Sequence, residues 1–152
     1  MTRNQIIQRL HTAKRNHLAW VGRAELLTQG HKIEKEQIPV LHTDCAFGDW
    51  YFGDGQVLNT LPEFQAIEAP HKHLHDAYAA VFKLITDEEN ASAFSKLLGM
   101  AKRKKEADQP IIHQHMNNLE QASNTVINSL EALEHRLHEM SDEEFEELVS
   151  GN

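Results

Sequence analysis

The sequence contains a single cysteine and eleven histidines, and these residue types often bind transition metals in proteins. Cys45 lies between polar residues and a cluster of aromatic residues and glycine. His71 and His75 are four residues apart, so on a helix both imidazoles project from one face and can reach the same ion. A histidine upstream of the cysteine would complete four ligands. We therefore hypothesise a zinc site formed by Cys45 and three histidines.

Several of these residues also have a simpler structural interpretation. His17 recurs with apolar residues at spacings of three and four, and a histidine on such a face is more often a core residue than a ligand. His42 is close enough to Cys45 in sequence to serve as a reserve ligand. His73 is expected to point away from His71, toward solvent. The aromatic residues around the cysteine are expected to pack in the core and to exclude water from the thiolate.

Helices and loops must bring these residues together. Apolar residues at intervals of three and four predict an amphipathic helix over residues 3–29. Residues 30–44 contain a proline and little periodicity, so we expect a loop there. Aromatic residues at helical spacing predict a short helix after Cys45, followed by a turn at residues 53–55. The cysteine is thus expected between a loop and a short helix.

The histidine pair falls in a second long helix. A threonine that could act as N-cap, followed by Pro62, predicts its start, and the pattern runs to about residue 85 with a break near Pro70. Residues 86–89, a threonine and three acidic residues, indicate a break and a new helix start. This third helix is expected to end before Pro110.

A last long helix is predicted over about residues 111–139. Apolar residues recur there at strict seven-residue intervals: Ile112, Leu119, Val126, Leu133 and Met140. This seam suits an antiparallel bundle or a dimer interface. The acidic segment that begins at Ser141 predicts a capped turn or short helix. We expect an all-α fold, an antiparallel four-helix bundle with a short extra helix carrying Cys45, in which residues 1–140 form the domain and residues 141–152 an acidic tail.

Composition narrows the classes of partner. A formal net charge of -8 argues against nucleic acid, because phosphate contacts need clustered lysine and arginine. The one basic run, residues 102–105, is followed by acidic residues and is interpreted as a solvated helix end favoured by the helix dipole. A single cysteine excludes an intramolecular disulfide and suits a reducing compartment. Since neither a signal peptide nor a bilayer-spanning segment is evident, we expect a cytoplasmic protein with no membrane partner.

Three motifs taken together resemble the chemoreceptor zinc-binding domain family. They are His17 followed by Trp20, the Cys-x-apolar-Gly-x-aromatic core that begins at Cys45, and the His-x-x-x-His pair. The resemblance extends over about residues 3–85. The resemblance implies that the zinc ligands are His17, Cys45, His71 and His75. It also implies an all-helical bundle and, commonly, a homodimer. Residues 86–110 depart from the family pattern, because this connection is longer than the usual one.

The resemblance also implies a zinc-binding sensory or regulatory role in bacterial signalling, such as chemotaxis or cyclic-di-GMP control. The stimulus would be zinc or an oxidant. Such domains are usually attached to a signalling rod or a diguanylate cyclase domain, and 152 residues leave room for neither. We therefore expect the signal to leave by contact with a partner protein, if the chain is complete.

Two other classes remain open on the residues alone. One is a metal-dependent enzyme in a helical bundle, but a di-iron bundle needs several inward glutamates with paired Glu-x-x-His motifs, and Glu68–His71 with Glu120 offers little of that. The other is a metal-free helical scaffold whose histidines are incidental. A zinc shell closed by four protein ligands leaves no position for an activated water, so we do not expect an enzyme.

Overall fold

The computed structural model describes residues 1–32, 38–97 and 101–151, and within residues 88–97 and 101–109 it describes the backbone only. Helices, turns and loops make up these ranges, with no β-strand among them, which confirms the expected all-α fold. No helix in this part of the chain is long and apolar enough to cross a membrane.

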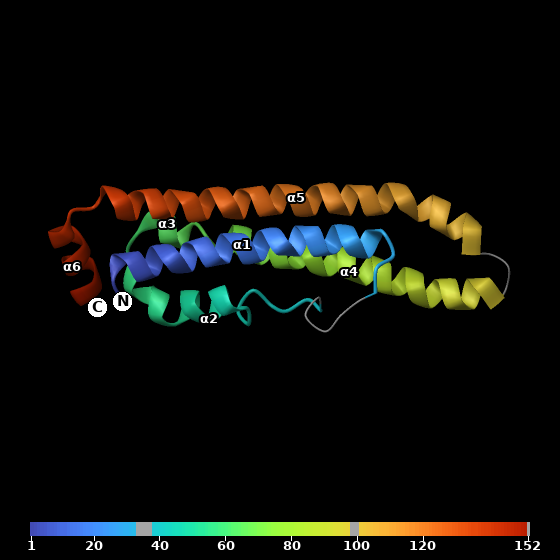
Figure 1. Cartoon of the computed structure of the whole chain (residues 1–152), viewed down its shortest axis with the longest axis horizontal. Coiled ribbons are helices and arrows are strands. Elements are labelled where there is room, and N and C mark those ends of the chain that lie inside the picture. The colour runs from blue at the N-terminus through green and yellow to red at the C-terminus, as the bar shows by residue number, and fades with distance from the viewer. Residues whose placement is uncertain (33–37, 98–100, 152) are drawn as a thin grey trace.

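Long helices dominate the described residues. The elements, in chain order, are α1 (Arg3–Thr28), α2 (Ala46–Phe52), the 3-10 helix η2 (Asp54–Leu58), α3 (Pro62–Gln65), α4 (Glu68–Leu97), α5 (Ala101–Glu139) and α6 (Asp142–Ser150). The long helices α1, α4 and α5 contact one another. Figure 1 shows that α1 and α4 run in the same direction and that α5 returns antiparallel to both. The short helices α2 and α3 lie on the return path between α1 and α4.

The predicted break at residues 86–89 is wrong. Helix α4 continues through this segment to Leu97. The hydroxyl of Thr86 donates to the carbonyl oxygen of Phe82 at 2.9 Å, within its own helix, instead of capping a new one. A threonine that bonds back to the preceding turn is compatible with an uninterrupted helix.

The predicted helix end before Pro110 is also wrong, because this proline lies inside α5. The basic run at residues 102–105 therefore falls near the beginning of a helix and not at its end. For residues 88–109, within the third helix that the sequence predicts, the structure describes no side chains. With these corrections the described residues form three long helices, so the expected four-helix arrangement is not confirmed.

Pro70 does not break a helix. Helix α3 ends at Gln65 and α4 begins at Glu68, so the interruption comes before the proline. Pro70 then sits in the first turn of α4, where its missing N–H has no intrahelical partner to lose. This arrangement places His71 and His75 in the first two turns of a long, well-anchored helix.

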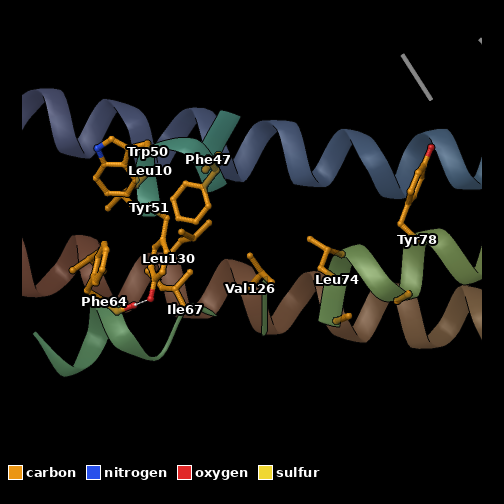
Figure 2. Packing of buried hydrophobic residues seen from close by; sticks show 14 of the residues in the cluster. Leu10, Phe47, Trp50, Tyr51, Phe64, Ile67, Leu74, Tyr78, Val126 and Leu130 are labelled. Atoms are coloured by element: carbon orange, nitrogen blue, oxygen red, sulfur yellow. Dashed lines mark hydrogen bonds between the residues drawn. The ribbon is translucent and has the colours of Figure 1, made fainter. Parts of the chain in front are cut away.

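The apolar residues that recur every seven positions along α5 and at Met140 form the centre of the core. Leu119, Val126 and Leu133 are completely buried, and Ile112 and Met140 at the two ends of the seam are nearly so. Figure 2 shows side chains from this seam and from α4 meeting in one cluster. Burying a large aliphatic side chain stabilises the fold by about 2 kcal/mol, so this seam holds α5 against the other long helices.

Aromatic packing holds α2 in place. The ring of Tyr51 stacks on Phe64, with centroids 4.3 Å apart, and its hydroxyl donates to the Phe64 carbonyl oxygen at 3.0 Å (Figure 2). Trp50 packs on the same phenylalanine. These contacts join α2 to α3 and so restrain Cys45, the N-cap residue of α2.

The acidic C-terminal segment is a capped short helix, as the sequence predicts. Ser141 caps α6 through a reciprocal pair of hydrogen bonds with Glu144. Phe145 is buried in the core cluster, under the guanidinium group of Arg3. That guanidinium also donates to the Ser141 carbonyl oxygen at 2.7 Å. The helix thereby closes the end of the molecule at which α1 begins (Figure 1).

Candidate metal centre

The structure brings the four candidate ligands into one cluster. His17 comes from α1, Cys45 from the residue before α2, and His71 and His75 from the start of α4. One potential ligand atom from each residue lies within 4.8 Å of the others. The three histidines are almost completely buried, whereas the cysteine is half-buried. Residues from three separate segments therefore meet in the interior.

His71 occupies the centre of this cluster. Its Nε2 atom lies 3.0 Å from Nε2 of His17, 3.1 Å from Nε2 of His75 and 3.4 Å from Sγ of Cys45. The pair at four-residue spacing thus does converge on one point, as their positions in the sequence suggest.

Backbone carbonyls orient two of the imidazoles. Nδ1 of His17 lies 2.7 Å from the carbonyl oxygen of Ala13, and Nδ1 of His75 lies 2.8 Å from that of Val40. A carbonyl only accepts, so Nδ1 carries the hydrogen in each neutral ring and Nε2 keeps its lone pair. Metal-binding histidines are usually held in this way, with the second ring nitrogen donating to a carbonyl or a carboxylate.

Hydrogen bonds alone do not account for the packing around His71. Two of its neighbours present Nε2 lone pairs, and a single Nε2–H can donate to only one of them at a time. A cation would satisfy all of these atoms together. Zinc bonds of about 2.0–2.1 Å to nitrogen place tetrahedral nitrogen ligands about 3.3 Å apart. This is close to the 3.0 and 3.1 Å that separate Nε2 of His71 from Nε2 of His17 and of His75. The three nitrogens and one sulfur, all within 4.8 Å of one another, are a donor set that suits zinc.

Cys45 is held at the beginning of α2. Its Sγ accepts from the backbone N–H of Gly48 at 3.2 Å and lies 3.6 Å from the carbonyl oxygen of His42. Burial raises the pKa of this thiol, although hydrogen bonds from the Gly48 and Phe47 backbone oppose the change. A bound dication would favour the thiolate strongly, because it supplies the charge that burial withholds.

Gly48 is required by this packing. A Cβ atom at this position would lie 1.9 Å from the carbonyl oxygen of His42, which is a backbone atom. The loop before Cys45 therefore crosses the first turn of α2 at a distance that only glycine allows. The Cys-x-apolar-Gly spacing of the motif thus has a direct steric cause.

Burial keeps the histidines neutral, which is the form that binds metal. Desolvation lowers the pKa of His17 to about 4, although its bond to Ala13 acts in the opposite direction. It lowers the pKa of His71 to about 2, with smaller contributions from the neighbouring histidines. The pKa of His75 is lowered as well, again chiefly by burial. All three imidazoles are therefore available as ligands at neutral pH.

Aromatic rings form the wall of the cluster. The ring of Phe47 meets those of His71 and His17 edge-on, at centroid distances of 5.0 and 6.0 Å. On the other side Trp20 packs against His75 at 4.6 Å. Phe47 is buried, as expected of the aromatic residues near Cys45, but a cavity of about 440 Å³ that is lined in part by His17 and Cys45 lies beside the cluster.

The other histidines near the site are placed differently. His42 is half-exposed, with its ring 5.9 Å from that of His71, and it is not part of the four-residue cluster. Its backbone carbonyl, not its imidazole, approaches Cys45. His73 is exposed, as expected. Sequence reasoning could not have identified the backbone carbonyls of Ala13 and Val40 as hydrogen-bond partners of His17 and His75, because every residue has such a carbonyl.

A comparison with protein families agrees with this geometry. Residues 17–82 match the family model of the chemoreceptor zinc-binding domain. The match confirms the resemblance suggested by the motifs, and it contains all four clustered residues. No curated protein and no solved structure gives a significant match to the chain. The family match and the cluster together indicate a zinc-binding signalling domain.

Proposed function

We propose that this protein binds one zinc ion through His17, Cys45, His71 and His75 and acts as a sensory or regulatory domain. The observation that carries the proposal is the convergence of three Nε2 atoms and one sulfur, with two rings already oriented by backbone carbonyls. Zinc would supply a positive charge that neutral imidazoles and a single thiolate can stabilise. It would also join α1, α2 and α4 at one point.

A regulatory role fits these ligands better than catalysis. Four protein ligands complete a tetrahedral shell, and catalytic zinc sites usually keep one position for water or substrate. We therefore propose that the protein is not an enzyme. A metal-dependent enzyme remains the alternative that metal analysis would reveal, if iron were found or if fewer than four of these residues were needed.

The decisive experiment is metal analysis of the protein purified without a histidine tag. We expect one zinc per chain, and we expect the double variant His71→Ala/His75→Ala to lose it. The matched control is His73→Ala, which removes an exposed histidine from the same helix and should leave zinc content unchanged. Absence of zinc from the wild type, or retention by the double variant, would contradict the proposal.

The coordination type can be tested independently. Replacing zinc by Co²⁺ should produce the visible absorption of a tetrahedral complex and a thiolate-to-metal band in the near ultraviolet. The Cys45→Ser variant should lose the thiolate band. An octahedral spectrum, or a thiolate band that persists without Cys45, would exclude the proposed ligand set.

We further propose a cytoplasmic protein of bacterial signalling, in pathways such as chemotaxis or cyclic-di-GMP control, that responds to zinc or oxidant. The signal would pass by protein contact, either in a homodimer or to a separate signalling partner. The apolar seam of α5 is largely used within the chain, since Leu119, Val126 and Leu133 are completely buried. A homodimer would therefore use other surfaces. Sedimentation of the zinc-loaded and metal-free protein tests both the dimer and its dependence on metal.

A further inference from the structure

His42 is a histidine beside the metal centre that the four-residue site leaves unused. It lies in the turn that leads to Cys45, and its side chain is half-exposed. The centroid of its ring is 5.9 Å from that of His71, the central histidine of the cluster. For comparison, the ring centroids of His17 and His75, two proposed ligands of one ion, are 5.7 Å apart. His42 is therefore about as close to the central histidine as two of the proposed ligands are to each other.

The backbone of His42 is packed against the cysteine. Its carbonyl oxygen lies 3.6 Å from Sγ of Cys45 and takes part in the tight crossing over Gly48. Since a Cα atom lies about 2.4 Å from its own carbonyl oxygen, the Cα of His42 is within about 6 Å of that sulfur. A change of side-chain rotamer can therefore bring a ring nitrogen toward the metal while the loop backbone stays in place.

The ring of His42 also lies within electrostatic reach of two proposed ligands. Burial is the main cause that lowers the pKa of His71 and of His75, and the nearby His42 contributes to both shifts. The same ring packs against Phe52 with centroids 5.8 Å apart, and Phe52 is 41% exposed. An aromatic contact at the surface is a weak restraint, so it does not fix the ring away from the site.

The number of zinc ligands decides when His42 can bind. Four ligands complete a tetrahedral shell, so His42 stays outside while Cys45 is bound. When the sulfur leaves the ion, one position opens, and water and His42 compete for it. Imidazole is a usual protein ligand of zinc, and a ring attached to the same loop is present at a high effective concentration. The open position is therefore expected to go to His42.

We propose that His42 is a substitute zinc ligand that takes the position of Cys45 whenever the sulfur is not bound. This inference rests on the proposed function, because it requires the ion at this site. The exchange replaces an anionic thiolate by a neutral imidazole, which raises the charge of the site, so the zinc affinity falls without being lost. Cys45, the N-cap residue of α2, is then released while the other ligands keep their places. The site thus has two states that differ at the beginning of α2.

A double-mutant cycle of zinc affinity, measured by competition with a chelator, tests this exchange. We expect His42→Ala to leave the affinity of the wild type unchanged. In a Cys45→Ala background the same substitution should weaken binding further by at least about tenfold, because even the hydrogen-bond partners of metal ligands typically contribute 10–100-fold. The matched control is His73→Ala, which removes an exposed histidine of α4 and should have no effect in either background.

Each other outcome of the cycle overturns the proposal. An equal loss in both backgrounds would mean that His42 acts indirectly, and no loss in the Cys45→Ala background would mean that water fills the open position. Failure of folded Cys45→Ala protein to bind any zinc would also overturn it. Cys45→Ser is a second background, because a serine hydroxyl can still accept from the backbone N–H of Gly48 as an N-cap. Circular dichroism checks the fold of each variant.

Nuclear magnetic resonance of protein with ¹⁵N-labelled histidine identifies the ring nitrogens that bind metal. In the Cys45→Ala variant, addition of zinc should give a ring nitrogen of His42 the shift of a metal-bound one, whereas in the wild type it should not. A purely structural role of His42 would not produce this difference. Absence of zinc from the wild type would overturn both proposals. A wild type that binds zinc, with a His42 ring that stays unbound in Cys45→Ala, would overturn the substitute ligand alone.

Discussion

His75 is joined to Val40 by a hydrogen bond of 2.8 Å that connects α4 to the loop preceding Cys45. The same loop delivers the cysteine to His71, whose Nε2 lies 3.4 Å from the sulfur. The loop is therefore held at both points by histidines of the candidate metal site: by His75 at the Val40 carbonyl and by His71 at Cys45. Because the loop contacts two candidate ligands, loss of metal is expected to change the position or mobility of this loop.

Removal of zinc should loosen residues 38–48 before it loosens the long helices. We expect backbone amides in this segment, including that of Gly48, to exchange faster with solvent after chelation, because Cys45 would lose its strongest restraint. Amides around Leu130 in α5, which is completely buried, serve as the internal control. Uniform acceleration across both regions would indicate global unfolding and contradict a local effect.

The tight crossing at Gly48 can be tested with a matched pair of glycines. Gly48→Ala should destabilise the protein by several kcal/mol and reduce zinc affinity, since its Cβ would meet the His42 carbonyl. Gly22→Ala, in an exposed part of α1 with open space around it, should instead stabilise the protein by about 0.5–1 kcal/mol. Urea unfolding and zinc titration measure both effects. Similar behaviour of the two variants would show that the crossing is looser than the structure indicates.

Acid should destabilise the metal-free protein through its buried histidines. The folded-state pKa of His17 is about 4 and that of His71 about 2, both below the ordinary value of 6.5. The unfolded chain therefore binds more protons, so the stabilisation is fully present above pH 6.5 and is lost as the pH falls toward those values. We expect a loss on the order of 2 kcal/mol per histidine between pH 7 and pH 5.

Urea unfolding at a series of pH values measures this loss. A variant in which the three buried histidines are replaced by asparagine should show a flatter profile over the same range. If the wild type and this variant respond equally to acid, the exposed histidines or the carboxylates are responsible instead.

Oxidation should release zinc through Cys45. Conversion of the thiolate to a sulfenic acid removes its charge and weakens its donation to the metal. We expect peroxide or hypochlorous acid to lower the zinc affinity of the wild type by at least tenfold and to change its helix packing. The Cys45→Ser variant, compared with and without oxidant, should show no such response. An oxidant response that is unaffected by the substitution would assign the effect to another residue, such as a methionine.

The sequence by itself determined the all-helical fold and the residues of the candidate site. Helical periodicity is a local property, and so are the four-residue spacing of His71 and His75 and the Cys-x-apolar-Gly pattern at Cys45. The steric need for Gly48 explains why that pattern could be recognised without the structure. The interruption predicted at residues 86–89 failed for the opposite reason, because a capping signal such as Thr86 can equally bond within a continuing helix.

Only the tertiary structure decided how the segments meet. It showed that His17 faces His71 from a different helix, a placement that the apolar stripe of His17 could not distinguish from ordinary core packing. The carbonyls that orient His17 and His75 belong to the backbone and leave no trace in the sequence. The cavity beside Cys45 likewise depends on two segments that are distant in the chain. The candidate ligands could be proposed from local patterns and the family resemblance, whereas ring orientation, burial and access depend on long-range packing that those patterns do not encode.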